Sequence, residues 1–143
     1  MIKHFLFVAV IITIIFIGAA CGNEGNDVNT QELPPTGTSV GGALMETGPE
    51  IDDDWELVSV QDRFQAGEEF YFSFNNNMPF DSEQVTIQLI DNSSEKVLAE
   101  SDYEVNPDHN SITDIIWFGS PGRYTIAAEV RGVVRATREV IIE

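Results

Sequence analysis

The segment Ser120–Val130, SPGRYTIAAEV, joins a turn to a strand and decides the fold class of the chain. Its first three residues are turn formers, because Pro restricts φ and Gly adopts backbone conformations that other residues avoid. Apolar side chains then recur at every second position, at Tyr124, Ile126, Ala128 and Val130. A two-residue period is typical of a strand with one buried face. The segment therefore predicts a tight corner followed by a half-buried β-strand.

The same period occurs in segments upstream. Glu69–Phe74 places its three Phe residues on one face, and Val85–Leu89 alternates in the same way. Short apolar runs give further candidate strands at Trp55–Val60, Lys96–Glu100, Tyr103–Val105, Asp114–Phe118 and Val134–Ile142. Turn residues separate these segments, and none of them has a sustained helical period. About seven or eight short strands over residues 55–143 predict an all-β fold, an antiparallel β-sandwich.

Within this pattern, Ser120–Val130 resembles the corner and strand F of immunoglobulin-like and fibronectin-III-like sandwiches. In those domains a Tyr two residues before a core position donates its hydroxyl to backbone a few residues upstream. The resemblance implies that Tyr124 is this tyrosine and that Ile126 holds the core position. The chain has one cysteine, so it lacks the disulfide of antibody domains. The likeness is to the broad bacterial group of such domains.

The final hairpin has two possible registers. A two-residue turn at Arg131-Gly132 would place Arg135 and Glu139 opposite inward-facing residues. A three-residue loop over residues 131–133 buries more apolar surface, so we expect it instead. That loop would turn inward Val134, Ala136, Val140 and Ile142. Arg138 would then also face inward, and we expect it at a bulge or at the rim of the sheet.

The chain begins with a short basic segment and the uncharged run Leu6–Ile17, LFVAVIITIIFI. This run has the length of a signal-peptide hydrophobic region and is short for a membrane span. Three small residues follow, and then Cys21. The sequence IGAAC resembles the lipobox of bacterial lipoproteins, with Gly18 where most lipoboxes have Leu. The resemblance implies a signal peptide over residues 1–20 and a diacylglyceryl group on Cys21, which would anchor the protein on the extracytoplasmic face of the cell membrane.

Residues 21–54 carry no Lys or Arg and are rich in acidic residues, Gly, Pro, Asn and Thr. No periodic apolar pattern is present, so the segment buries too little surface to offset the entropy lost on ordering. We therefore predict three parts for the chain. These are a signal peptide at 1–20, a lipidated and disordered acidic tether at 21–54, and a folded domain at 55–143.

The formal net charge of the chain is −17. Such an excess of acidic residues argues against nucleic acid as a partner, because phosphate binding requires clustered Lys and Arg. The sequence has no zinc-ligand spacing, phosphate-binding Gly-rich loop or nucleophile elbow. His109 is the only histidine after Cys21. We therefore predict no catalytic residue, no metal and no cofactor, and we retain a metal-dependent enzyme that uses the acidic loops as the least favoured alternative.

Aromatic and Asn-rich loops of a sandwich are candidate ligand-binding loops. The candidate binding residues are Asn76, Asn77, Met78, Phe80, Trp117 and Phe118. A second hypothesis concerns Arg123, Arg131, Arg135 and Arg138, which either form a basic stripe or balance acidic neighbours on adjacent strands. We expect a non-enzymatic domain that binds a protein of the cell envelope or an exported protein. The alternative is an inhibitor, or an accessory or spacer subunit of a surface complex, acting through strand addition at a sheet edge.

Overall fold

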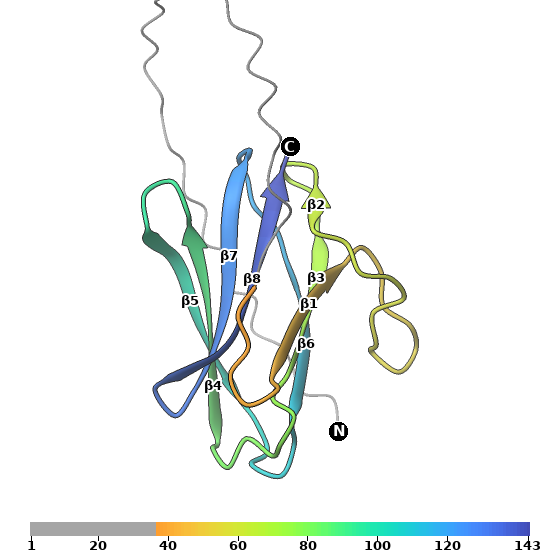
Figure 1. The fold of residues 1–143 in the computed structure, drawn as a ribbon. Coiled ribbons are helices and arrows are strands. Elements are labelled where there is room, and N and C mark those ends of the chain that lie inside the picture. The colour runs from red at the N-terminus through yellow and green to blue at the C-terminus, as the bar shows by residue number, and fades with distance from the viewer. Residues whose placement is uncertain (1–36) are drawn as a thin grey trace, which may run out of the picture. The chain divides into compact units, whose positions relative to one another are not determined.

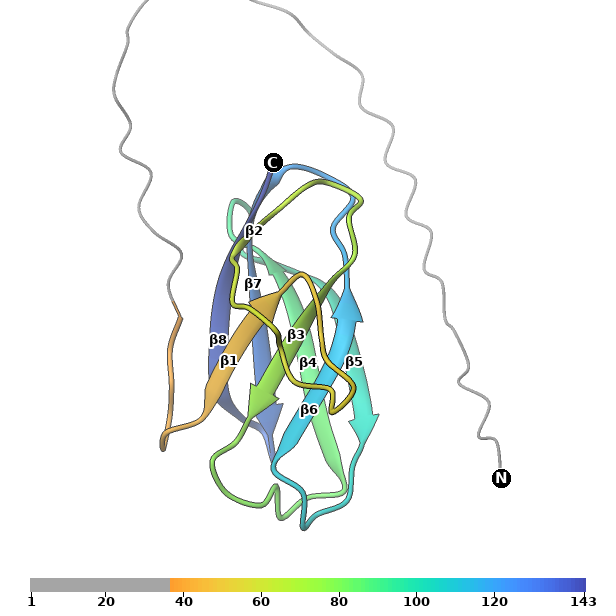
Figure 2. The ribbon, with the colours of Figure 1, turned by 90° about the vertical axis from the view of Figure 1, so that its right-hand side faces the viewer.

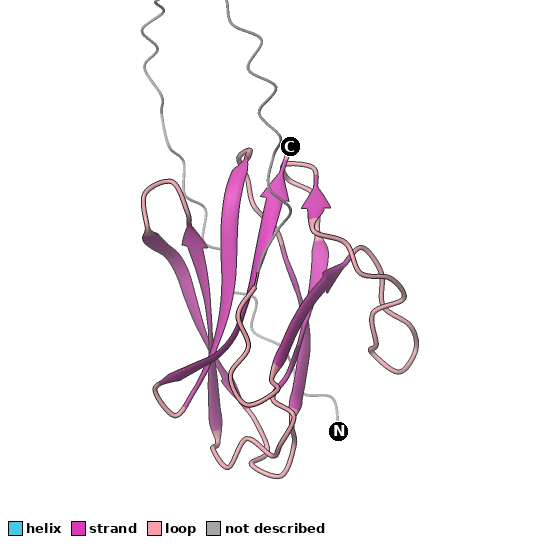
Figure 3. Cartoon of the chain, in the orientation of Figure 1, coloured by secondary structure: helices cyan, strands magenta, loops and turns pink. Residues whose placement is uncertain are grey.

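The computed structural model describes residues 37–143, which form an all-β sandwich without a helix (Figures 1 and 3). The strands are β1 (Leu44–Gly48), β2 (Arg63–Phe64), β3 (Phe70–Asn75), β4 (Gln84–Asp91), β5 (Lys96–Glu104), β6 (Ser111–Ile116), β7 (Gly122–Val130) and β8 (Val133–Ile142). The eight strands confirm the fold class predicted from the alternating segments. The predicted signal peptide, Cys21 and the tether up to residue 36 lie outside the described residues.

The strands form two sheets, with orders β1-β3-β6 and β2-β8-β7-β4-β5. All neighbouring strands are antiparallel except β2 and β8, which are parallel. Within this topology β4-β7-β8 and β1-β3-β6 take the places of strands C-F-G and A-B-E of an immunoglobulin-like sandwich. In Figure 2 the three-stranded sheet lies in front of the five-stranded sheet.

The core between the sheets is rich in aromatic side chains. Phe70, Phe72 and Phe74 of β3 are fully buried, whereas the alternating residues Tyr71 and Ser73 are only partly buried. The aromatic rings contact one another, with centroid distances of 3.8 Å for Phe64–Phe70, 6.3 Å for Phe72–Tyr103 and 6.0 Å for Phe74–Phe80. Full burial of a Phe side chain stabilises a fold by about 1.5–3 kcal/mol. The inward face of β3 therefore holds the two sheets together.

The tyrosine corner predicted from the sequence is present. The Tyr124 hydroxyl donates a hydrogen bond of 2.9 Å to the carbonyl oxygen of Ser120. The ring stacks on Phe118 with 4.2 Å between the ring centroids. A Cβ atom at Gly122 would lie 3.3 Å from the Tyr124 ring, in a backbone conformation with φ +159°. The hydroxyl group of Tyr124 thus ties the corner to the strand, and the absence of a side chain at Gly122 leaves room for the ring.

Two assignments near the start of the domain are wrong. Residues 44–48 were predicted to lie in the disordered tether, but they form β1 and pair with β3, Met45 opposite Phe74. Trp55–Val60 was predicted as a strand, but it lies in the loop between β1 and β2. The apolar side chains of this loop lie on the outside of the sandwich, where Val58 and Val60 are exposed. The folded part of the chain therefore begins before residue 55.

The last hairpin differs from the expected register. Its turn consists of Arg131 and Gly132, both with positive φ, and β8 begins at Val133. A bulge follows, because Ala128 pairs with Ala136 while Glu129 pairs with Val134. The bulge restores the inward direction of Ala136, and Val140 and Ile142 are buried as predicted. Val134 was also predicted to be buried, but it is exposed, because it precedes the bulge that changes the alternation of the strand.

Candidate binding groove

The loop residues proposed from the sequence as a binding site do not form one surface. Asn75 at the end of β3 pairs with Ser111, whereas Phe70 at its start pairs with Ile116. The loop that follows Asn75 and the segment that follows Ile116 therefore lie at opposite ends of the sandwich (Figure 2). The first loop contains Asn76, Asn77, Met78 and Phe80, and the second segment contains Trp117 and Phe118.

Three of these six residues are buried structural positions. Phe80 packs against Phe74, and Phe118 stacks on Tyr124. The Asn76 amide nitrogen donates to the Met78 carbonyl oxygen at 3.0 Å, and its Oδ1 accepts from Arg135 Nε at 3.1 Å. The other three are accessible to solvent.

Of the accessible residues, Met78 is 49% and Trp117 is 55% exposed. Asn77 is also exposed and donates from its side-chain amide to the Gly41 carbonyl oxygen. Because Trp117 lies at the other end of the sandwich, these side chains are available singly rather than as a cluster.

Three of the four late arginines pair with acidic residues, so the four do not form a basic stripe. The ion pairs are Arg123–Glu139, Arg131–Asp81 and Arg138–Asp62, each with a shortest N–O distance of 2.6 Å. Arg138 faces inward, opposite Ile126 on β7, and its two-point contact with Asp62 keeps its charge paired near the edge of the sheet. Arg135 is the bulged residue and bonds Asn76, and its Nη2 is buried without a hydrogen-bond partner in the described structure.

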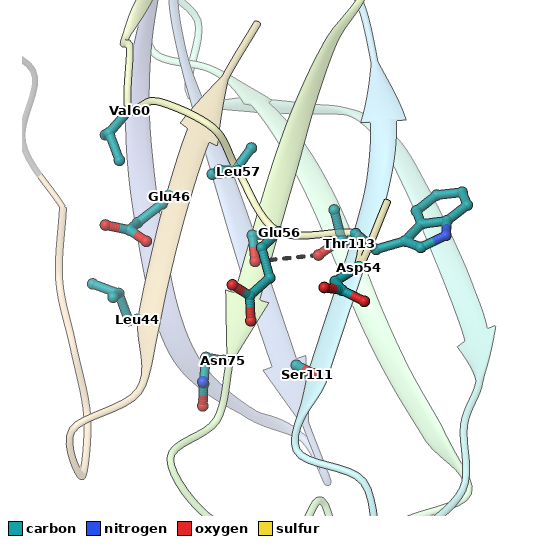
Figure 4. Close-up of a pocket in the computed structure, with 11 residues that line it drawn as sticks. Leu44, Glu46, Asp54, Glu56, Leu57, Val60, Asn75, Ser111 and Thr113 are labelled. Carbon is teal, nitrogen blue, oxygen red and sulfur yellow. Dashed lines mark hydrogen bonds between the residues drawn. The ribbon is translucent and has the colours of Figure 1, made fainter. Parts of the chain in front are cut away.

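The feature that the sequence analysis missed is a groove on the outer face of the three-stranded sheet. The loop over residues 49–62 passes across this face in front of β3 and β6 (Figure 2). Between the loop and the sheet lies a groove of about 560 Å³ (Figure 4). Its lining consists of Leu44, Glu46, Asp54, Trp55, Glu56, Leu57, Val60, Ser73, Asn75, Ser111 and Thr113. Sheet residues form its floor and loop residues form its wall.

The loop is held in this position by its own polar contacts. The Asp52 carboxylate accepts hydrogen bonds from the backbone N–H groups of Asp54 and Glu56 at 3.0 and 2.9 Å. This contact turns the chain at Trp55, which has φ 65° and is 60% exposed. Gly48 allows the return of the loop, because a Cβ atom there would collide with the Ser59 carbonyl oxygen. In this acidic segment Asp52 therefore stabilises the turn, while Asp54 and Glu56 line the groove.

Carboxylates dominate the electrostatics of the groove. Glu46 projects from β1, while Asp54 and Glu56 lie on the loop above the sheet (Figure 4). The lining contains no Lys, Arg or His, and within residues 37–143 no basic side chain pairs with these three carboxylates. Hydroxyl and amide groups from Ser73, Thr113 and their neighbours complete the floor, with a 3.2 Å bond between the Ser73 and Thr113 hydroxyl groups. The groove therefore combines unpaired negative charge, apolar side chains and hydrogen-bonding groups.

A search of residues 37–143 for three or more His, Cys, Asp or Glu side chains arranged to hold a metal ion finds no such group. The described chain has no helix with the length and hydrophobicity that crossing a bilayer requires. Comparison with known families finds no matching family model, and comparison with curated proteins finds no similar sequence.

Proposed function

We propose that this protein is a membrane-anchored surface lipoprotein whose sandwich domain binds an envelope or exported protein without catalysing a reaction. The anchoring part of the proposal rests on the N-terminal sequence, in which an apolar run and three small residues lead to the single cysteine, Cys21. Two acyl chains on that cysteine would hold the protein stably at the membrane, because each buried CH₂ group contributes about 0.8 kcal/mol.

Replacement of the acceptor thiol tests the anchoring. In Cys21→Ser cells we expect no incorporation of labelled fatty acid into the protein, and a shift of the protein from the membrane fraction to the precursor form or the medium. Ser is nearly isosteric with Cys but does not accept the diacylglyceryl group. Equal acyl labelling of the two proteins contradicts the proposal.

The binding part of the proposal rests on one observation, the groove on the outer face of the β1-β3-β6 sheet. Trp55, which lines it, is one of the most exposed large apolar residues of the domain. Exposed Trp side chains are enriched at protein interfaces because they bury a large area at a low entropic cost.

Chemical crosslinking of the full-length protein in intact cells tests for a partner. We expect one or a few defined crosslinked species that contain a second envelope or exported protein. The same experiment on a strain without the gene identifies background products. A domain that remains uncrosslinked at every crosslinker length would contradict the binding function.

Strand addition by an inhibitor or accessory subunit is the second candidate, and one observation favours it. Strand β5 is the last strand of its sheet and is exposed along nearly its whole length. A bulge opposite Leu89 and Ile90, together with Glu100, Asp102 and Glu104, argues against this candidate, because such features discourage the pairing of an edge with other strands. A photoreactive residue at Leu98 that captures a partner would favour this candidate over the groove.

A further inference from the structure

We infer that the groove binds an extended peptide segment that carries Lys or Arg side chains at alternate positions. This inference rests on the proposed function, because it names the chemistry of the segment that the partner protein would present. The ligand class follows from the charges, the apolar side chains and the polar floor of the groove.

The first argument is charge complementarity. Glu46, Asp54 and Glu56 face the groove from two separate parts of the chain, and none of them has a cationic neighbour among residues 37–143. The ion pairs Asp62–Arg138 and Glu139–Arg123, by contrast, lie outside the groove. A chain with a net charge of −17 gains nothing in its own stability from three more unpaired carboxylates placed around one groove. A cationic partner would neutralise them and would be attracted over a distance of about a Debye length.

The second argument is that the lining suits a peptide better than a compact ion. The carboxylates are distributed along the groove, and they do not form a group that could coordinate a metal ion. Leu44, Leu57 and Val60 line the same groove. The aliphatic stems of Lys and Arg can pack on such side chains while the charged ends reach the carboxylates.

The floor and Trp55 add two further contacts that an extended cationic segment can use. Hydroxyl and amide side chains on the floor, at Ser73, Asn75, Ser111 and Thr113, match the donors and acceptors of a peptide backbone. Trp55 has an exposed indole ring, and the negative face of this ring attracts the cationic side chains of Lys and Arg. The anionic surface of a membrane leaflet is excluded as the occupant, because the same carboxylates repel it.

The test uses the full-length chain in a nonionic detergent and a fluorescein-labelled peptide with lysine at alternate positions, separated by valine and serine. Fluorescence anisotropy should show saturable binding that weakens as the salt concentration rises from about 50 mM to about 500 mM. A matched peptide with glutamate in place of lysine should not bind. In a Trp117→Phe background, Trp55 is the only remaining Trp, and its emission should shift when the lysine peptide binds.

The decisive variant is Glu46→Gln/Asp54→Asn/Glu56→Gln, which removes the groove charges without removing side-chain volume. We expect it to bind the lysine peptide about tenfold more weakly, since several partly exposed charge pairs are lost together. The control is Glu69→Gln/Glu104→Gln/Asp108→Asn, which removes the same charge from exposed positions outside the groove. Its affinity should stay within about twofold of the unsubstituted protein. No binding of the lysine peptide overturns the inference, and so does equal weakening in the two variants.

Failure of this inference can be distinguished from failure of the proposed function. If crosslinking in cells captures a partner equally well from the groove variant and from the unsubstituted protein, the binding function stands and the groove assignment is wrong. If neither the lysine peptide nor any cellular partner binds, both fail.

Discussion

The outer faces of the two sheets differ in how their acidic residues are paired. On the five-stranded sheet, three acidic side chains have a polar partner on a neighbouring strand. Thr86 donates to Asp102 at 2.7 Å, Gln88 donates to Glu100 at 2.9 Å, and Arg123 pairs with Glu139 at 2.6 Å. On the three-stranded sheet the carboxylates of the groove have no such partners among the described residues.

This difference separates charges that serve the fold from charges that remain available to a partner. Cross-strand pairs of opposite or hydrogen-bonding side chains stabilise a sheet modestly. A carboxylate without a cationic neighbour contributes no such term and retains its full attraction for an external cation. Substitutions on the two faces should therefore affect different measurements, with stability changes on one face and binding changes on the other.

The largest effect is expected in the core that both faces share. Phe72 is fully buried and contacts Tyr103 edge to face. Phe72→Ala should reduce the free energy of unfolding by about 3–5 kcal/mol, because it removes buried apolar surface and leaves a cavity. Leu44→Ala, in the exposed lining of the groove, should change it by less than about 0.5 kcal/mol. Denaturant unfolding of the two variants measures the contrast, and equal losses would show that the groove side of the sheet is buried.

The next largest effect distinguishes a paired aspartate from an unpaired one. Asp62→Ala should reduce stability by about 2 kcal/mol, since it breaks two charge-assisted hydrogen bonds to the partly buried Arg138. Asp54→Ala should leave stability within about 0.5 kcal/mol of the unsubstituted protein. Thermal unfolding of both variants provides the comparison. A larger loss in Asp54→Ala would mean that the loop, rather than the ion pair, holds this part of the domain.

A third prediction concerns alkaline pH. Burial and the hydrogen bond to Asp114 raise the pKa of Tyr103 above its ordinary value of 10.0, and burial followed by the charge of Asp91 raises the pKa of Tyr124. Above pH 10 the unfolded chain loses these protons before the folded chain does, so stability should fall as pH rises from about 10. Well below that pH both tyrosines are protonated in the folded and the unfolded chain, so they add no pH dependence to the stability. The free energy of unfolding should be measured from about pH 9 to about pH 11.5 in steps of about half a pH unit. Its decline with pH should be shallower in Tyr103→Phe than in the unsubstituted protein. An unchanged decline would contradict the assignment.

A smaller effect is expected at the tyrosine corner. Tyr124→Phe removes the hydrogen bond to the Ser120 carbonyl and keeps the ring, so it should cost about 0.5–1.5 kcal/mol. Met78→Ala, at an exposed position of the opposite end, is the control for a surface change. Arg123 is unsuitable for that purpose, because it forms an ion pair with Glu139. Equal stability of Tyr124→Phe and the unsubstituted protein in denaturant would show that the corner does not depend on its hydroxyl.

The parts of the fold that the sequence predicted are those with a strong local pattern. Strands β3, β4 and β7 alternate apolar and polar residues because one face of each is buried, and the corner at Tyr124 has its own short motif. Strand β1 lacks such a pattern: it is five residues long, ends at a Gly and buries the polar residue Thr47. Only the pairing with β3, distant in sequence, makes it a strand. Tertiary contacts, rather than a local sequence pattern, therefore determine that this segment is a strand.

The groove escaped prediction for a related reason. Its residues come from β1, β3, β6 and the loop over residues 49–62, so no short stretch of sequence contains them. The short apolar run Trp55–Val60 predicted a strand, but the segment is part of a loop and its residues Trp55, Val58 and Val60 are exposed. A partial signal was present in the outward residues of β3 and β6 that line the groove, which are Ser, Thr and Asn rather than charged residues.

The most direct test of the division between the two faces is site-specific photocrosslinking in intact cells. A photoreactive residue replaces Val60, which is exposed and lines the groove. We predict that this protein captures a defined partner, and that Glu46→Gln/Asp54→Asn/Glu56→Gln in the same protein strongly reduces the capture while Glu69→Gln/Glu104→Gln/Asp108→Asn preserves it. Capture that persists unchanged without the three groove charges, or capture only from Leu98 on β5, would contradict the account.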